Sequence, residues 1–369
     1  MRYVILTKRN ELDSVLSGIE QAGEVVVDLE TTSLATHSKD IKIVGIGLCY
    51  DNNTAFYIPQ NHKDQEISLE DVKPVLEDSN VAKIGHNIKY DARVFNRFGV
   101  NLKNIIFDTF VASYCLHGDR IRHNLDDLTL DHFNHVKIRT KDVIPRKSKK
   151  LPNPTMLDSP IEKVAVYCCE DVWYTFKLYK ELKRILRLPY NQAAFKLFYD
   201  IELPLLPVLI DMECTGVAID PEKIVELNNK FEDLAKQEKD LVDKALGREL
   251  IISNPNDISK AIYEELKIQD KLGVVIKMTP TGKFSTSKDT LNSLKKDGFV
   301  NSILNIKKLM KLTKTYMSSF PEYISGHTGL IHTFFNQCRT STGRLSSSEP
   351  NLQNQPSRDE LGREIRSLY

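Results

Sequence analysis

Glu24–Ser33 reads EVVVDLETTS, a valine-rich run that carries two carboxylates, and this stretch decides the fold of the first half of the chain. Side chains on a strand alternate between the two faces of a sheet, so Asp28 and Glu30 are expected to point the same way. Thr31-Thr32-Ser33 ends the strand and leaves the pair at a sheet edge, where ligands commonly bind. Taken alone, an acid pair at a strand end is more typical of solvated surface than of a site.

Strand-like and helix-like segments alternate around this stretch through residues 1–187, which predicts an α/β fold. Lys42–Tyr50 and Thr54–Ile58 are apolar, and Asp51-Asn52-Asn53 between them is typical of a hairpin turn. Another short strand is expected around Val81–Ile84. Helical periodicity is present in Leu69–Leu76, Tyr90–Phe98 and Ile161–Leu186. Ser159-Pro160 supplies an N-cap and a first-turn proline for the last helix, and the order as a whole predicts a mixed sheet flanked by helices.

The second half has a different texture, because long amphipathic stretches replace the alternation. We expect helices over Phe195–Glu213, Pro221–Leu246 and Val300–Tyr323, with only short strand-like pieces such as Gly216–Ile219 and Gly329–Phe334. A boundary near Leu188-Pro189 therefore predicts two domains, residues 1–187 and 188–369.

Composition excludes several classes of protein. Hydrophobic residues make up 41% and charged residues 27%, which is an ordinary globular balance rather than a disordered or fibrous one. The N-terminal apolar run is too short for a signal peptide, and no stretch reaches the roughly 18 apolar residues of a membrane span. Six cysteines without a CxxC pair indicate reduced core thiols and argue against a zinc site. We therefore expect no membrane partner and a cytoplasmic or nucleoid-associated protein.

Local basic segments stand out although the net charge is only +1. Lys137–Lys150 holds seven basic residues and one acid, and Pro152 and Pro154 follow it. An exposed loop is predicted, either simply solvated or flanking a phosphate; composition by itself favours the solvated interpretation.

Two further patterns follow the acid pair. In Gly85–Asp91 (GHNIKYD), Asn87 is expected to cap a helix and Asp91 to lie one turn into it. In Tyr167–Asp171 (YCCED), Tyr167 and Asp171 are four residues apart and share a helix face, whereas Glu170 lies on another. Four carboxylates and a phenol would repel one another without cations, so two divalent ions, Mg²⁺ or Mn²⁺, are the natural match. Two such metals can activate a water and stabilise the leaving oxygen of a phosphodiester.

On these motifs the sequence resembles the tyrosine-containing branch of the DEDD exonuclease superfamily, and within it the proofreading domain of family-A DNA polymerases, the DNA polymerase I type. DLETTSL, GHNIKYD and the Tyr167–Asp171 helix correspond to its three exonuclease motifs, and FDTFVASYCL and RHNLDDL also look like that family's. The resemblance implies a ribonuclease H-like fold and a 3'-5' exonuclease acting on single-stranded DNA ends.

The same resemblance implies residue roles. Asp28 would bridge the two metals, Glu30 and Asp171 would hold the metal on the nucleophile side, and Asp91 would serve the other, while Tyr167 would orient the attacking water. Contacts to the terminal nucleotides are implied for Thr31, Leu34 and Asn87, with Leu34 wedged against the last bases.

Thr342–Asn354 (TGRLSSSEPNLQN) is the most specific string of the second half, which resembles the thumb and the start of the palm of the same polymerases. By composition alone it would be a polar, turn-rich loop. The resemblance implies contacts to the minor groove of a primer–template duplex from Arg344, Asn351, Gln353 and Asn354. Lysines at the thumb would meet phosphates, although a solvated helix face explains them too; those assigned to DNA are Lys307, Lys308 and Lys311.

Three functional hypotheses remain open at this point. The first is a metal-dependent 3'-5' DNA exonuclease joined to part of a polymerase. The chain stops before the family's catalytic palm aspartates, so polymerisation by this chain alone is not expected. A second hypothesis is therefore a binding subunit or fragment whose palm and fingers would come from a separate polypeptide. The third is an RNA exonuclease of the ribonuclease D type, which requires a different RNA-binding module in the second half.

Overall fold

The computed structural model describes residues 2–36, 38–62, 66–120, 122–276, 278–279, 282–356 and 359–369. The chain forms two compact units: Met1–Val217 with Ser325–Gln353, and Ala218–Ile324 with Asn354–Tyr369. Ser325–Gln353 thus belongs to the first unit although it lies far along the sequence. A single boundary near residue 188 does not describe this arrangement. That boundary stays a prediction. Among the described residues, none of the helices combines the length and apolar character needed to cross a bilayer.

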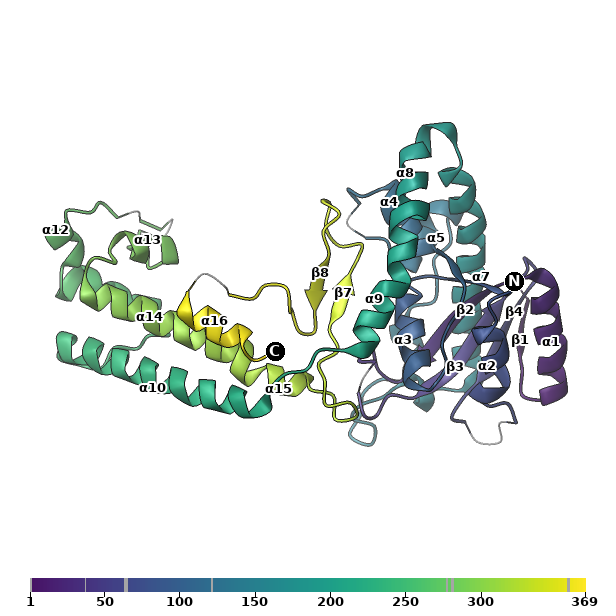
Figure 1. Cartoon of the computed structure of the whole chain (residues 1–369), viewed down its shortest axis with the longest axis horizontal. Helices are drawn as coiled ribbons and strands as arrows, with labels where there is room; N and C mark the ends of the chain where they lie inside the picture. The colour runs from purple at the N-terminus through teal and green to yellow at the C-terminus, as the bar shows by residue number, and fades with distance from the viewer. Residues whose placement is uncertain are drawn as a thin grey trace. The chain divides into compact units, whose positions relative to one another are not determined.

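A six-stranded mixed sheet forms the centre of the first unit and confirms the predicted fold class (Figure 1). Its spatial order is β1-β4-β3-β2-β5-β6. β3 is antiparallel to β2 and to β4, whereas β2, β5 and β6 run parallel to one another and β1 runs parallel to β4. The strands are β1 Arg2–Ile5, β2 Glu24–Thr31, β3 Ile43–Cys49, β4 Thr54–Pro59, β5 Ala82–Gly85 and β6 Ile105–Asp108.

The central strand β2 is covered on both faces. Val26 belongs to the apolar cluster that contains α7, whereas Val25, Val27 and Leu29 belong to a second cluster on the other face. Because side chains alternate along a strand, Asp28 shares the α7 face with Val26. Asp28 and Glu30 of this valine-rich strand therefore lie on the face that packs against α7.

Helices α1–α6 and one 3-10 turn complete the two layers. α2 confirms the helix expected over Leu69–Leu76, and the Asp51 side chain accepts hydrogen bonds from the amides of Asn53 (2.7 Å) and Thr54 (2.9 Å) in the predicted β3–β4 turn. The elements are α1 Arg9–Ala22, α2 Leu69–Glu77, α3 Lys89–Arg97, α4 Thr109–Leu116, α5 Leu125–Phe133, α6 Thr140–Val143 and η1 Met156–Asp158.

The long helix α7 (Ile161–Leu186) packs against β2, β3 and β4 and has the predicted bounds. Its N-cap is Pro160 rather than the predicted Ser159. Ser159 lies one residue too early to cap the free amides, and its hydroxyl donates instead to the carbonyl of Val143 (2.8 Å). A Cβ on Gly47 of β3 would lie 2.6 Å from Sγ of Cys168, so glycine at this position allows the close approach of helix and sheet.

The first unit ends in a helical run and a small hairpin. The run predicted over Phe195–Glu213 is present as η2 Pro189–Asn191, α8 Gln192–Lys196, η3 Leu197–Glu202 and α9 Leu203–Thr215. The two strand-like predictions were too long, because only the isolated bridge Val217–Ile331 forms there and β7 (Phe334–Asn336) starts at the end of the second piece. β7 pairs with β8 (Ser346–Ser348), which lies inside Thr342–Asn354, the string that would be a loop by composition alone.

The second unit is mainly helical, as predicted. Figure 1 shows α10 and α14 side by side with α16 beside them. Salt bridges Lys230–Glu364 (2.8 Å) and Lys308–Asp359 (2.8 Å) connect the last segment to the two long helices. Its elements are α10 Pro221–Leu246, α11 Pro255–Ser259, η4 Lys260–Glu265, α12 Ile268–Leu272, α13 Lys288–Ser293, α14 Gly298–Leu312, η5 Thr313–Ser318, α15 Phe320–Tyr323 and α16 Glu360–Arg366.

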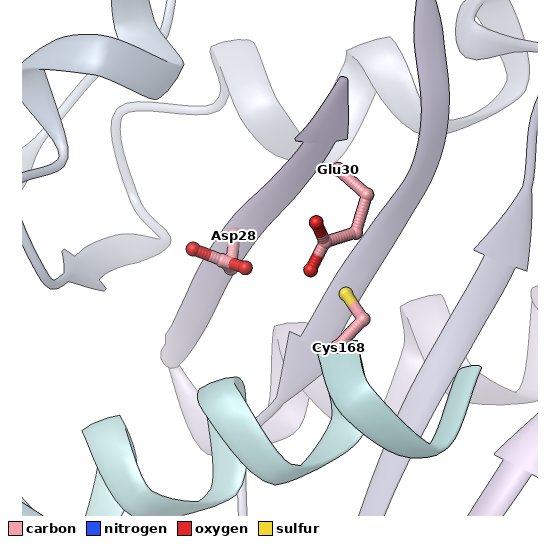
Figure 2. A group of neighbouring side chains, drawn as sticks. All are labelled: Asp28, Glu30 and Cys168. Atoms are coloured by element: carbon pink, nitrogen blue, oxygen red, sulfur yellow. The ribbon is translucent and has the colours of Figure 1, made fainter. Parts of the chain in front are cut away.

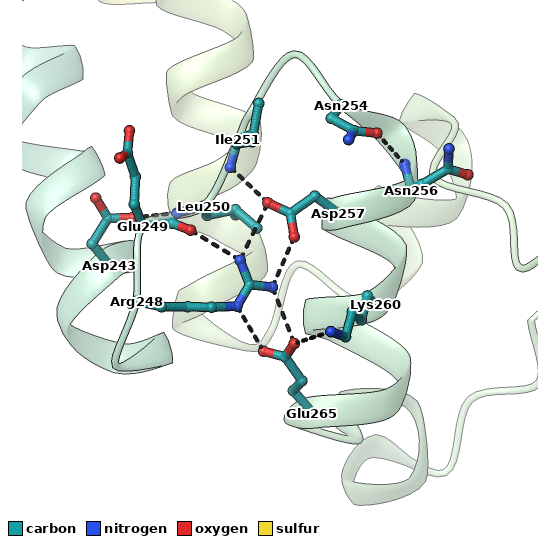
Figure 3. A network of polar contacts seen from close by, with 10 residues as sticks. All are labelled: Asp243, Arg248, Glu249, Leu250, Ile251, Asn254, Asn256, Asp257, Lys260 and Glu265. Carbon is teal, nitrogen blue, oxygen red and sulfur yellow. Dashed lines mark hydrogen bonds and ion pairs between the residues drawn. The ribbon is translucent and has the colours of Figure 1, made fainter.

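A polar network fixes the chain after α10 (Figure 3). Arg248 donates from Nη2 to Asp257 (2.8 Å) and to Glu265 (3.1 Å). Asp257 also accepts from the amide of Ile251 (2.8 Å). One guanidinium thus connects the turn after α10 to both α11 and η4, which is the fork geometry that suits arginine.

Candidate metal centre

Asp28 and Glu30 lie together on the α7 face of β2 (Figure 2). One carboxylate oxygen of each and Sγ of Cys168 lie within 4.8 Å of one another. Burial raises the pKa of the Cys168 thiol well above its ordinary value, with the two carboxylates adding to the effect. A protonated thiol is a poor metal ligand, so the oxygens are the donors that this corner offers.

Asp91 reaches the same site from α3. The carboxylate of Asp91 accepts a hydrogen bond from the amide of Leu29 (2.9 Å), and its side chain is only 3% exposed. The predicted N-cap role of Asn87 was wrong: α3 starts at Lys89 after Ile88, and Asn87 is exposed with φ of 56°. Asp108 at the end of β6 accepts from the amides of Asn87 (3.1 Å) and Ile88 (2.9 Å), and so it supplies the cap from another strand.

Tyr167 and Asp171 lie on α7, one turn apart, as the spacing predicts. Asp171 is buried, and the Tyr167 hydroxyl lies 2.9 Å from Oγ1 of Thr140. Burial raises the pKa of Tyr167, and the neighbouring Asp171 has the second largest effect in the same direction. The phenol is therefore neutral. A neutral hydroxyl can orient a water by hydrogen bonding.

The four carboxyls share one electrostatic site. Burial raises the pKa of Asp28 to about 8, and the neighbouring Asp171 contributes to this rise. Burial likewise raises the pKa of Asp171 to about 6. It raises the pKa values of Glu30 and Asp91 well above their ordinary values, and Asp28 is the neighbouring charge that adds most to each of these two shifts. Such a group resists ionising together unless cations enter it. Its hard oxygen donors fit Mg²⁺ or Mn²⁺.

Lys137 is the residue that sequence reasoning missed. Its side chain is 1% exposed rather than solvated, and its ammonium contacts the carboxylate of Asp171 and that of Asp126 (3.2 Å). This contact lowers the pKa of Asp171 against the larger effect of burial. The composition of the basic segment Lys137–Lys150 could not predict this burial, because composition does not show which side chains of a loop point into the protein.

Glu170 explains how that lysine is placed. Its carboxylate accepts hydrogen bonds from Nε2 of His135 (2.7 Å) and from the amide of Ile138 (2.7 Å). The buried Glu170 therefore holds the His135 ring on one side of Lys137 and the Ile138 backbone on the other.

The residues expected to contact the terminal nucleotides are Thr31 and Leu34, at the end of β2, and Asn87, which precedes α3; we call them the rim residues. The Thr31 hydroxyl donates to the carbonyl of Ser33 (3.0 Å), and the Tyr90 hydroxyl, missed from sequence, donates to the same carbonyl (2.8 Å). Leu34 is 82% exposed. His86, interpreted from sequence as structural, lies 2.8 Å from Oγ1 of Thr109, and burial lowers its pKa to about 3.

The residues assigned to DNA in the second half are divided between the two units. Arg344, Asn351 and Gln353 are exposed in the first unit, and Asn354 is exposed in the second. Lysines of α14 line a cavity of about 390 Å³ in the second unit together with Lys295; they are Lys307, Lys308 and Lys311. Lys308 is already paired with Asp359, so its charge is partly offset.

Comparisons with known proteins found two family models that match parts of this chain. Residues 3–187 match a family model described as 3'-5' exonuclease, and residues 221–369 match one described as DNA polymerase family A. DNA polymerase I of Pseudomonas aeruginosa is 32% identical and that of Chloroflexus aurantiacus 31% identical, over 100% and 99% of this chain. The chain spans only 40% and 38% of the length of these relatives. The polymerase model thus matches the part of the chain in which a ribonuclease D-type function would require a different RNA-binding module.

One solved structure is similar over the whole chain. It is the POL domain of Pol1 from M. smegmatis in complex with a DNA primer-template and dNTP, with a TM-score of 0.76 and 25% sequence identity. The similarity covers 100% of this chain and 58% of that one.

Proposed function

Because the chain belongs to the DNA polymerase I type of family-A DNA polymerases, with the 3'-5' exonuclease domain and the start of the polymerase domain, we propose that it is a metal-dependent 3'-5' exonuclease acting on DNA. It would hydrolyse the terminal phosphodiester and release nucleoside monophosphates. The observation that carries the proposal is the group of four carboxyls beside β2, three of them buried and Asp28 half-buried, whose pKa values burial raises above their ordinary range.

The carboxylates would hold two divalent cations, Mg²⁺ or Mn²⁺, in this site. Asp28 would bridge them, with Glu30 and Asp171 on the nucleophile side and Asp91 on the other. When bound, two such ions activate a water and stabilise the leaving oxygen of a phosphodiester. The neutral Tyr167 hydroxyl would orient that water, and its contact with Thr140 would fix the ring.

The rim residues would bind the 3' end. Leu34 would pack against the last bases because a large apolar side chain exposed beside the carboxylates gains by covering a base. Thr31 and Asn87 would add polar contacts to the terminal nucleotides. A single-stranded end is the substrate that we propose.

The polymerase-type part would bind primer–template duplex. Arg344, Asn351, Gln353 and Asn354 would donate to minor-groove acceptors, which are largely independent of sequence. The lysines of α14 would meet phosphates. We propose template-directed synthesis only for this part combined with the family's remaining palm and fingers. These would lie on the same polypeptide or on a separate one.

The test is release of 3'-labelled nucleotide from a single-stranded oligonucleotide in Mg²⁺. The double variant Asp28→Ala/Asp171→Ala is expected to lose release, whereas Glu162→Gln, an exposed acid on the same helix, retains it. Persistence of release in the double variant refutes the assignment. Matched DNA and RNA oligonucleotides compared in the same assay test the DNA specificity, and preference for RNA contradicts it.

A further inference from the structure

The ammonium of Lys137 lies between two carboxylates that belong to different helices. Asp171 is on α7, and Asp126 is in the first turn of α5. Nζ forms an ion pair with Oδ1 of Asp171 and donates a hydrogen bond to Oδ1 of Asp126 (3.2 Å). The side chain of Asp171 is 13% exposed, whereas that of Asp126 is 55% exposed. One lysine thus contacts a buried acceptor and a solvated one.

The segment that carries Lys137 is attached to α7 by a separate contact. Glu170 accepts a hydrogen bond from the amide of Ile138 (2.7 Å), the residue after Lys137. The main chain is therefore held at this point without the ion pair, and the ammonium lies at the end of a flexible four-carbon chain. A rotation of that chain can break the contact with Asp171 while the ammonium stays with Asp126.

The contact with Asp171 occupies a carboxylate that the proposed function assigns to a metal ion. Asp171 and Glu30 would hold the ion on the nucleophile side, and an ammonium and a doubly charged cation at one carboxylate repel each other strongly at such close range. Nζ also lies 5.6 Å from the ring centroid of Tyr167, the residue proposed to orient the water. Lys137 therefore occupies the side of the site to which the nucleophile is assigned.

The other side of the site has no such lysine. Within the described part of the chain, Asp28, Glu30 and Asp91 have no ion-pair partner. Asp91 instead accepts a hydrogen bond from the amide of Leu29 (2.9 Å), which is a neutral donor. An ion held by Asp28 and Asp91 therefore has no ammonium to displace, and the two proposed metal positions differ in this respect.

We propose that Lys137 competes with the nucleophile-side metal ion for Asp171, and that this ion binds only when the ammonium leaves Asp171 for Asp126. The inference rests on the proposed exonuclease function and deepens it by giving the site an order of loading. Asp91 takes up the first ion, and Asp171 takes up the second with lower affinity, because it must first release the ammonium. Lys137 is thus a positioning residue that acts through Asp171, and it delays hydrolysis until the second ion is present.

The test is Mn²⁺ binding to the whole chain without DNA, at fixed pH and ionic strength. Binding is measured by isothermal titration calorimetry and by the electron paramagnetic resonance signal of free Mn²⁺. Wild type is compared with Lys137→Met, Asp126→Asn, the double variant of these two, and Asp171→Asn. Lys141→Met is the matched control, because it removes an exposed lysine of the same segment.

Wild type is expected to bind two Mn²⁺ ions with different Kd values, and Asp171→Asn to lose the weaker step. Lys137→Met is expected to tighten the weaker Kd about 30-fold. This change is about 2 kcal/mol at 1.4 kcal/mol per factor of ten, which is within the range for close charge pairs. The tighter Kd changes less than about threefold, because salt screens the more distant charge, and Lys141→Met changes neither Kd.

Asp126→Asn is expected to act in the opposite direction. It weakens the weaker step about threefold, because the displaced ammonium loses a half-exposed acceptor. In the Lys137→Met background the same substitution has little further effect, whereas a direct effect of the Asp126 charge on the ion would persist there. Because Asp126 is half exposed, this measurement does not depend on whether Lys137→Met folds.

The outcomes distinguish the two proposals. Competition is overturned if Lys137→Met tightens neither Kd or both equally, or if Asp126→Asn tightens the weaker step. An equal effect of Asp126→Asn with and without Lys137 also overturns it. Two-step Mn²⁺ binding by a wild-type chain that releases no 3'-nucleotide in Mg²⁺ contradicts the exonuclease function, and the Kd values still decide the competition.

Discussion

Lys137→Met removes the one buried ammonium that contacts the carboxylate group among the described residues. Its side chain is 1% exposed and contacts Asp171, which is itself buried. Breaking a buried pair by removing one partner costs about 3–5 kcal/mol. We expect about 3 kcal/mol, the lower end, because Asp126 re-solvates easily and Asp171, with a pKa of about 6, can take up a proton. For a unit of this size that corresponds to a fall in Tm of about 6–12 °C.

The assay is denaturant unfolding of wild type and Lys137→Met, in EDTA and again in excess Mg²⁺. In EDTA the full loss is expected, whereas in Mg²⁺ bound cations supply the missing positive charge and the difference shrinks to less than about 1 kcal/mol. Lys141→Met, an exposed lysine of the same segment, is the control and is expected to be neutral. An equal loss in both conditions, or no loss in EDTA, refutes the counter-ion role of Lys137.

Four further predictions concern the same two units. In EDTA, the free energy of unfolding should fall as pH rises from about 4 to about 8. The reason is that Asp28, with its folded pKa of about 8 against an ordinary 3.8, holds a proton that the unfolded chain releases. Mg²⁺ should abolish the fall, and a flat profile in EDTA contradicts this prediction. Tyr167→Phe should lower kcat about 10²-fold with Mn²⁺ affinity by calorimetry unchanged; weaker metal binding would instead make Tyr167 structural. Gly47→Ala should cost about 1–3 kcal/mol in denaturant unfolding, since its Cβ would lie 2.6 Å from Sγ of Cys168; a neutral effect would mean that α7 shifts freely. The last prediction concerns the three lysines of α14, Lys307, Lys308 and Lys311. Replacing all three with glutamine should reduce the slope of log K against log salt for duplex binding by about 2, which is less than expected for three phosphate contacts because Lys308 is paired with Asp359. An unchanged slope would mean that these lysines are simply solvated.

Strong periodicity made the main elements predictable. The bounds of α7 and α10 agree with the sequence, and the β3–β4 hairpin forms around the expected turn. These segments are long or have an apolar face that only one secondary structure can bury, so local pattern and tertiary packing agree. The same holds for Asp28 and Glu30, because strand alternation fixes their common face.

Predictions failed where a partner from elsewhere in the chain decides the outcome. Ser159 and Asn87 were expected to be caps, but Ser159 bonds Val143 and Asp108 of β6 caps the start of α3. Gly216–Ile219 was expected to be strand-like and forms only a single bridge, to Ile331. In each case local propensity is weak, and the distant partner contributes more to the free energy.

The sequence by itself determined the strand, the helices and the order of the acids, because side-chain periodicity and helix spacing are local properties. Only the tertiary structure decided that Lys137, from a segment typical of solvated loop, lies buried against Asp171. It also decided that residues 334–341 form one wall of a cavity whose other wall is more than two hundred residues away in the chain. Both depend on burial, which raises the free energy of an unpaired charge and so selects partners by distance in space.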